Sequence, residues 1–172
     1  MHMDNIESRR AEIERNGFGL MMTHGVSMRP LIWGGRHCVT VVPLKDDPAP
    51  GDLVMFRELR GDREVEILHR VVEVRRTGDG CVYITRGDNC VACEQVSRDR
   101  IIGRVTEVHR LTGFRPWYAI PTRRFTVDDR AYRVYSRVWA ATWQVRRVYY
   151  ILRSRAYGVR RRVMSLLRRK RQ

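Results

Sequence analysis

A serine at position 27 stands where the sequence changes from a strand pattern to a turn that begins with proline. It lies in the segment Gly25-Val26-Ser27-Met28-Arg29-Pro30, whose glycine allows another part of the backbone to approach closely. Such a junction can expose the serine hydroxyl as a nucleophile for acyl transfer. The structural alternative is that the Ser27 side chain caps a short turn over residues 28–33. The segment lacks the second glycine of a hydrolase nucleophile elbow.

A serine hydroxyl becomes a good nucleophile only when a nearby base takes its proton. The chain has two lysines, Lys45 in a polar loop and Lys170 in a terminal basic cluster, and neither position favours a desolvated amine. Histidine therefore remains as the base. His69 has Ile67 and Val71 as neighbours on the same face of a predicted strand, which favours its neutral, proton-accepting form. The alternative is a strand histidine that only satisfies a hydrogen bond.

The cysteines and glycines point to no metal or cofactor. Cys90 and Cys93 have the spacing of half a zinc or redox site, but no second pair and no cluster of His and Cys accompanies them. We expect them to be incidental thiols, because the chain also lacks an export signal. No glycine-rich phosphate loop is present, and serine hydrolysis requires no cofactor.

Short strands joined by tight turns must position Ser27 and His69. The predicted strands cover residues 19–23, 37–42, 52–58, 65–75, 81–86 and 101–109. The turns between them are rich in Gly, Asp, Asn and Pro and are too short for parallel crossovers, which favours antiparallel pairing. A polar segment at residues 5–15 precedes them as a short predicted helix. The sequence therefore predicts a mostly β, compact antiparallel domain.

Charge divides the chain into two parts. Residues 1–122 carry 18 Lys and Arg against 17 Asp and Glu, whereas residues 123–172 carry 16 against 2. In the basic part Tyr135, Trp139 and Trp143 recur at helical spacing. The predicted organisation is a helical segment at 1–18, a β-rich domain at 19–122 and a basic amphipathic helical tail at 123–172.

The basic tail and the absence of long apolar runs bear on partners and location. Aromatic residues on one side of a helix with arginines elsewhere suit the surface of an anionic membrane. Nucleic acid, or packing of the first part of the tail onto the β domain, are the alternatives. No apolar run approaches the roughly 18 residues that span a membrane, and the start of the chain lacks the apolar core of a secretory signal. We expect a cytoplasmic protein that is either soluble or held peripherally at the inner face of the membrane.

Five segments resemble, in order, the motif boxes of the signal peptidase and SOS-repressor superfamily of serine peptidases. They are residues 27–30 (SMRP), 50–56 (PGDLVMF), 68–72 (LHRVV), 85–89 (TRGDN) and 102–105 (IGRV). The nearest resemblance is to the endoplasmic-reticulum and archaeal signal peptidases, which have His-Arg-Val where bacterial enzymes carry a catalytic lysine. The resemblance covers residues 20 to 110. It implies a β peptidase domain of signal-peptidase type, with Ser27 as nucleophile and His69 as general base.

The resemblance also implies an acid that orients His69 and stabilises its protonated form. The candidates are Asp88, in Gly87-Asp88-Asn89, and Glu94, which stands where the histidine branch generally has a second aspartate. Because glutamate is one methylene longer, we expect Asp88 to be the required acid and Glu94 to have a lesser role. The structural alternative for Asp88 is a turn residue that bonds its own backbone.

The segment around Ser27 is expected to contact the substrate. By resemblance, the backbone N–H of Ser27 forms the oxyanion hole, and Gly25 replaces a small hydroxyl residue that signal peptidases often use there. No role falls to His24. The expected substrate-binding residues are Gly25, Met28 and Pro30.

These observations predict a serine endopeptidase, similar to signal peptidase I, that acts through an acyl-enzyme. Its expected substrate is an extended leader or precursor peptide with small residues before the scissile bond. The alternative is a catalytically silent peptidase-like module that binds a peptide or nucleic acid through its cleft and tail.

Overall fold

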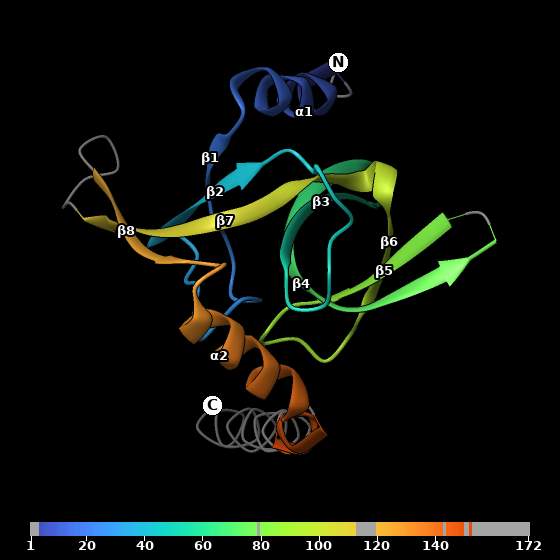
Figure 1. Cartoon of the computed structure of the whole chain (residues 1–172), viewed down its shortest axis with the longest axis vertical. Helices are drawn as coiled ribbons and strands as arrows, with labels where there is room; N and C mark the ends of the chain where they lie inside the picture. Colours follow the sequence, from blue (N-terminus) through green and yellow to red (C-terminus); the bar gives the residue numbers. More distant parts are fainter. Residues whose placement is uncertain (1–3, 79, 113–119, 143, 150–151, 153–172) are drawn as a thin grey trace, which may run out of the picture. The chain divides into compact units, whose positions relative to one another are not determined.

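One antiparallel sheet contains every strand in the part of the chain that the computed structural model describes, residues 4–78, 80–112, 120–142, 144–149 and 152. The strands are β1 (Gly19–Met22), β2 (His37–Val42), β3 (Leu53–Arg60), β4 (Arg63–Thr77), β5 (Gly80–Arg86), β6 (Glu94–Ser97), β7 (Ile101–Thr112) and β8 (Ile120–Thr126). Their order is β1-β2-β7-β3-β4-β5-β6, and β8 also pairs with β7 (Figure 1). Helix α1 (Asp4–Asn16) precedes the sheet, η1 (Arg98–Arg100) lies between β6 and β7, and α2 (Arg130–Ala141) follows β8. The prediction of a mostly β, antiparallel fold with a C-terminal helical region is confirmed.

Strand β4 is paired on both sides at the position that matters for the site. Arg70 is opposite Leu53 of β3 and also opposite Arg86 of β5. A residue at such a point has a fixed backbone, because both edges of its strand are held by neighbouring strands. His69 and Arg70 therefore stand on a rigid part of the sheet and, as successive residues of a strand, face opposite sides.

The two faces of β3 supply two hydrophobic clusters. Leu53 and Met55 belong to one cluster, and Val54 and Phe56 belong to the other, as expected from the alternation of side chains along a strand. Ile13 of α1 joins the first cluster and is 2% exposed, so α1 is anchored to the sheet. The sheet thus separates two cores and presents a different one to each side of β4.

The strands expected from the sequence are confirmed, with ends that differ by a few residues, but β6 and β8 were not predicted. Strand β6 has four residues, of which only Val96 is buried, and β8 contains a proline and two arginines. Neither segment shows the apolar alternation that marks a half-buried strand. Tertiary pairing with β5 and β7 makes them strands.

The chain divides into two compact units, Met1–Arg137 and Val138–Gln172. The expected boundary near residue 122 lies inside β8, and α2 begins after Asp129, whose carbonyl accepts the Arg133 N–H at 3.0 Å. The sequence becomes basic near residue 122, but the first compact unit continues to Arg137. Strand β8 and the first turns of α2 are therefore basic and still belong to the first unit. Trp143, residues 150–151 and residues 153–172 of the tail lie outside the described residues. Within the described ranges, no helix is both long enough and apolar enough to cross a membrane.

Candidate active site

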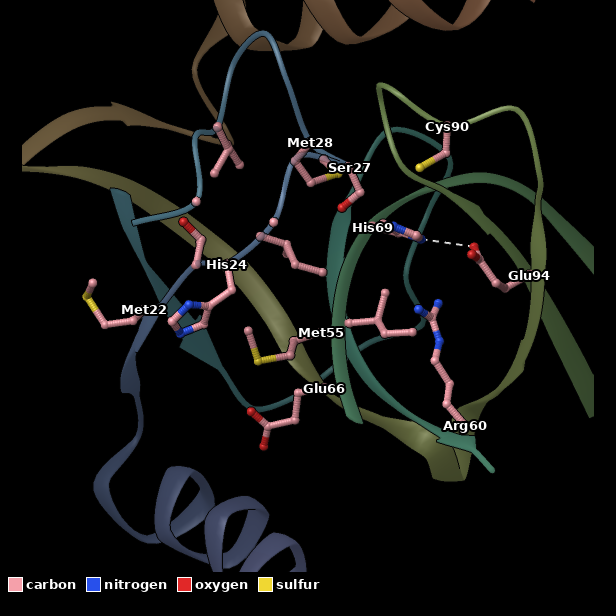
Figure 2. A pocket seen from close by; sticks show the side chains of 16 residues that line it. Met22, His24, Ser27, Met28, Met55, Arg60, Glu66, His69, Cys90 and Glu94 are labelled. Atoms are coloured by element: carbon pink, nitrogen blue, oxygen red, sulfur yellow. Dashed lines mark hydrogen bonds and ion pairs between the residues drawn. The ribbon is translucent and has the colours of Figure 1, made fainter. Parts of the chain in front are cut away.

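A cavity of about 330 Å³ brings together side chains from three separate parts of the chain. Figure 2 shows Ser27, on the loop after β1, on one side of the His69 ring and Glu94, on β6, on the other. Methionine and aliphatic residues form much of the remaining wall, and they are Met22, Met28, Ile32, Met55, Ile67 and Leu68. The cavity therefore combines an apolar wall with a serine hydroxyl, an imidazole and a carboxylate.

His69 is held by the second hydrophobic cluster. Its ring lies against the ring of Phe56 in an edge-on arrangement, with centroids 6.1 Å apart, and the residue is 3% exposed. Ile67 and Val71, its neighbours on the same face of β4, belong to that cluster. These contacts leave His69 with one fixed orientation, as a positioned base requires.

Glu94 binds His69 because of the register of β4, β5 and β6. Val71 is opposite Thr85 of β5, and Thr85 is opposite Glu94 of β6, so Glu94 reaches the face of the sheet that carries His69. The Glu94 Oε2 atom lies 2.9 Å from His69 Nδ1. A proton on Nδ1 then donates to the carboxylate and leaves the Nε2 lone pair free to accept another proton.

The protonation of His69 depends on its two partners. Burial alone would lower the pKa of His69, but hydrogen bonds to Cys90 and Glu94, together with their charges, outweigh burial and raise the pKa to about 9. The ring thus binds a proton readily and gives it up only above neutral pH.

Asn89 attaches the loop that carries Ser27 to the segment after β5. Its backbone N–H donates to the Ser27 carbonyl at 2.7 Å, and its side-chain Nδ2 donates to the Val26 carbonyl at 3.1 Å. Gly25 has a φ of +75°, a left-handed conformation that a residue with a side chain rarely adopts. The position of Ser27 is therefore set by its neighbours on the loop and by a contact with a distant segment.

The residues expected to bind substrate lie in different surroundings. Gly25 and Met28 line the cavity together with Ser27, and Met28 is also buried in the first hydrophobic cluster. Pro30 is exposed and is not among the lining residues, and its carbonyl accepts the indole N–H of Trp33 at 2.7 Å. Met28 thus serves both the core and the cavity wall, whereas Pro30 shapes the turn.

Asp88 does not have the expected role of orienting His69. Its Oδ1 and Oδ2 atoms accept from Nε and Nη2 of Arg70, both at 2.8 Å, and both side chains are 2% exposed. The partner of His69 is Glu94 instead. The physical reason is the alternation along β4, because Arg70 faces the opposite side from His69 and draws the carboxylate there.

Arg70 joins the β sheet to α2. Its Nη1 atom donates to Tyr132 and Ser136, both at 2.7 Å, and to the Gly51 carbonyl at 3.1 Å. Burial alone would lower the pKa of Arg70, but the hydrogen bonds to Asp88 and its charge raise it above the ordinary value. The buried guanidinium therefore stays charged, with its donors satisfied by a carboxylate, a hydroxyl pair and a carbonyl.

The sequence pattern indicates no role for Arg70 or Asn89, and it marks Cys90 only as half of a metal or redox site that lacks its second half. Arg70 follows His69 directly, and Asn89 and Cys90 follow Asp88, so all three lie within or next to the segments that carry the resemblance. Their roles depend on contacts between segments that are distant in the sequence. Among the described residues, no group of three or more His, Cys, Asp or Glu side chains is placed to hold a metal ion.

Neutralising Asp88 should mainly reduce stability, whereas neutralising Glu94 should mainly reduce activity. Asp88→Asn leaves Arg70 buried without its charge partner and should destabilise the fold by about 3–5 kcal/mol. Glu94→Gln should leave the fold little changed and, if His69 acts as a base, lower turnover by about 10³-fold to 10⁴-fold. Urea denaturation and peptide hydrolysis measure the two effects, with Glu73→Gln, in an exposed pair with Arg75, as the control for charge. Loss of activity without loss of stability in Asp88→Asn would return the orienting role to Asp88.

Comparison with known proteins assigns the chain to no group. No family model matches it, and no curated protein matches it.

Proposed function

We propose that the protein is a serine endopeptidase in which Ser27 is the nucleophile, His69 the general base and Glu94 the acid that orients His69. The observation that carries this proposal is that all three line one cavity, with Nδ1 of His69 held by Glu94. A histidine with one ring nitrogen held by a carboxylate is the arrangement that serine hydrolases use to orient the base for proton transfer. The resemblance of the five segments to signal-peptidase motif boxes supports the same assignment.

In the proposed reaction His69 Nε2 takes the Ser27 proton as the Ser27 oxygen attacks a peptide carbonyl. The oxyanion that forms is stabilised by the Ser27 backbone N–H, and the His69 proton then passes to the leaving amine. Water hydrolyses the acyl-enzyme by the same transfers in reverse order. The hydrogen bond between a nucleophile and its base often shortens only when substrate binds. It is therefore enough for this proposal that Ser27 and His69 line the same cavity.

The exposed edge of the sheet at β1 favours an extended peptide as the substrate, because such a peptide can pair with an edge strand. Strand β1 is the last strand in the order of the sheet, and Leu20 and Met22 on it are about half exposed. A peptide that pairs with β1 would run toward Ser27, because Met22 lines the same cavity. The methionines of the wall, being flexible and apolar, suit a small or apolar side chain next to the scissile bond.

A fluorophosphonate probe tests the nucleophile. The intact protein should form a covalent adduct at Ser27, whereas Ser27→Ala should form none and His69→Ala should react far more slowly. Because nucleophile and base act as a unit, the double variant should hydrolyse peptide no more slowly than either single variant. Mass spectrometry of the labelled protein locates the adduct. A well-folded protein without an adduct would favour the silent peptide-binding module.

The pH dependence of hydrolysis should follow His69. A general base must be neutral, and the pKa of His69 is raised to about 9, so kcat/KM should rise with pH through about 9 and level off above it. Below that pH the rate should fall about tenfold per unit. A pH profile with a short soluble peptide measures this, and a rate that is independent of pH between 6 and 10 would contradict the assignment of His69.

We further propose that the unit Val138–Gln172 binds an anionic membrane surface. Val138, Val145, Val148 and Leu152 are each more than half exposed and recur at intervals that put them on one side of a helix. The many arginines of this unit, among them Arg146 and Arg147, add attraction for acidic lipid. An exposed apolar line with basic flanks is the pattern of an interfacial helix.

Removing residues 157–172 should weaken binding to vesicles that contain an acidic lipid. The deletion takes away seven basic residues, and the remaining attraction should fall further as salt rises, since charges are screened within about 10 Å at 0.1 M salt. Co-sedimentation with acidic and neutral vesicles measures binding, and hydrolysis of a soluble peptide serves as the control. Equal binding to neutral vesicles, or unchanged binding after the deletion, would contradict a membrane role.

A further inference from the structure

A thiol shares the proposed catalytic base with Ser27. Cys90 lines the cavity beside His69, in the segment that follows β5 (Figure 2). Gly87 makes room for this contact, because a Cβ atom there would lie 2.8 Å from Cys90 Sγ and 2.8 Å from His69 Nε2. Because both atoms lie 2.8 Å from this one position, Cys90 Sγ and His69 Nε2 are at most twice that distance apart. The same Cβ position is 2.8 Å from the Ser27 carbonyl oxygen, so the backbone of Ser27, the His69 ring and the thiol meet around one glycine.

The Nε2 atom of neutral His69 has a single lone pair, which can accept a proton from either the Cys90 thiol or the Ser27 hydroxyl. Nδ1 is held by Glu94, so a proton from Cys90 or from Ser27 must go to Nε2. Glu94 lies 2.9 Å from Nδ1 of His69, and Cys90 acts together with Glu94 to raise the pKa of the ring. A thiol is a much stronger acid than a serine hydroxyl, and Glu94 stabilises the imidazolium that results. Proton transfer from Cys90 to His69 would give a thiolate and imidazolium pair, the form in which other Cys and His sites react.

We propose that Cys90 is a reactive thiol that soft electrophiles modify, and that this modification switches off the chemistry of Ser27. The first part stands on the placement of Cys90 between Gly87 and His69, and the second part rests on the proposed peptidase function. The ligand class is a compound with a soft electrophilic atom, such as an alkyl halide or a hydroperoxide.

The covalent step needs only groups that the cavity supplies. With iodoacetamide the Cys90 sulfur attacks the methylene carbon, the C–S bond forms, and iodide leaves while the proton stays on His69. With hydrogen peroxide the sulfur attacks one oxygen, the O–O bond breaks, and the departing hydroxide takes the His69 proton and leaves as water. The thiol is oxidised to a sulfenic acid and the peroxide is reduced. In both cases the adduct occupies space within the cavity that Ser27 shares.

The other cysteines provide internal controls. Cys93 is exposed, whereas Cys90 is partly buried, so access alone predicts that Cys93 reacts faster. Cys38 is buried, and burial raises the pKa of its thiol, so it should react slowly. Greater reactivity at Cys90 than at Cys93 would therefore come from its base and not from its exposure.

Alkylation by iodoacetamide tests whether Cys90 is a reactive thiol. The reaction with the full chain is quenched at timed intervals, the protein is digested, and mass spectrometry gives the rate at each cysteine. At pH 7 Cys90 should alkylate on the order of tenfold faster than Cys93, because the thiolate is the attacking species and His69 beside Cys90 can take its proton, whereas a free thiol is only a few per cent ionised. Glu94→Gln and His69→Ala should each bring the Cys90 rate down to or below that of Cys93, with the Cys93 rate unchanged. Equal rates at the two cysteines of the intact protein, or a fast Cys90 in a folded Glu94→Gln variant, would overturn the proposal.

Fluorophosphonate labelling of Ser27 tests the second part. Iodoacetamide should abolish labelling of the intact protein and of Cys93→Ala, and it should leave labelling of Cys90→Ala as it was before treatment. Labelling that survives full alkylation of Cys90 would overturn the link to Ser27. If Ser27 of the untreated protein takes no label, the proposed peptidase function fails, while the alkylation rates still decide whether Cys90 is a reactive thiol.

Discussion

The buried ion pair between Arg70 and Asp88 is the interaction on which the site depends. Both side chains are 2% exposed, so neither charge is compensated by water, and each needs the other to remain buried. Arg70 also binds Tyr132 and Ser136, which ties the start of α2 to the sheet. Asp88 in turn holds the segment that follows β5. One charge pair therefore joins a strand, a loop and a helix that are far apart in the sequence.

The segment Gly87-Asp88-Asn89-Cys90 works on both sides of β4 because His69 and Arg70 face opposite ways. Asp88 reaches Arg70 on one side, while Gly87 and Cys90 lie against His69 on the other. Asn89 adds two hydrogen bonds to the loop that carries Ser27. The position of Ser27 relative to His69 thus follows from a loop that contacts each of them and is anchored by an ion pair.

His69 is a base whose strength is set by competing environments. The hydrophobic cluster around Phe56 favours the neutral ring, whereas Glu94 and Cys90 favour the charged ring, and the charged form prevails at neutral pH. In the proposed peptidase, this balance favours activity in alkaline solution. The proposed thiol at Cys90 makes the same balance responsive to electrophiles, because it competes with Ser27 for Nε2.

The sequence by itself determined the antiparallel β fold, the strand that carries His69 and the turn that carries Ser27, because side-chain alternation and turn residues are local signals. It favoured Asp88 over Glu94 as the partner of His69, whereas the fold places Glu94 against His69 and Asp88 against Arg70. That choice depended on strand register across β4, β5 and β6 and on Arg70 facing the opposite side, and both are properties of long-range pairing. Tertiary structure also decided that β6 and β8 are strands, because they form only by pairing with β5 and β7. It decided the position of Cys90 as well, because the fold brings this thiol close to His69.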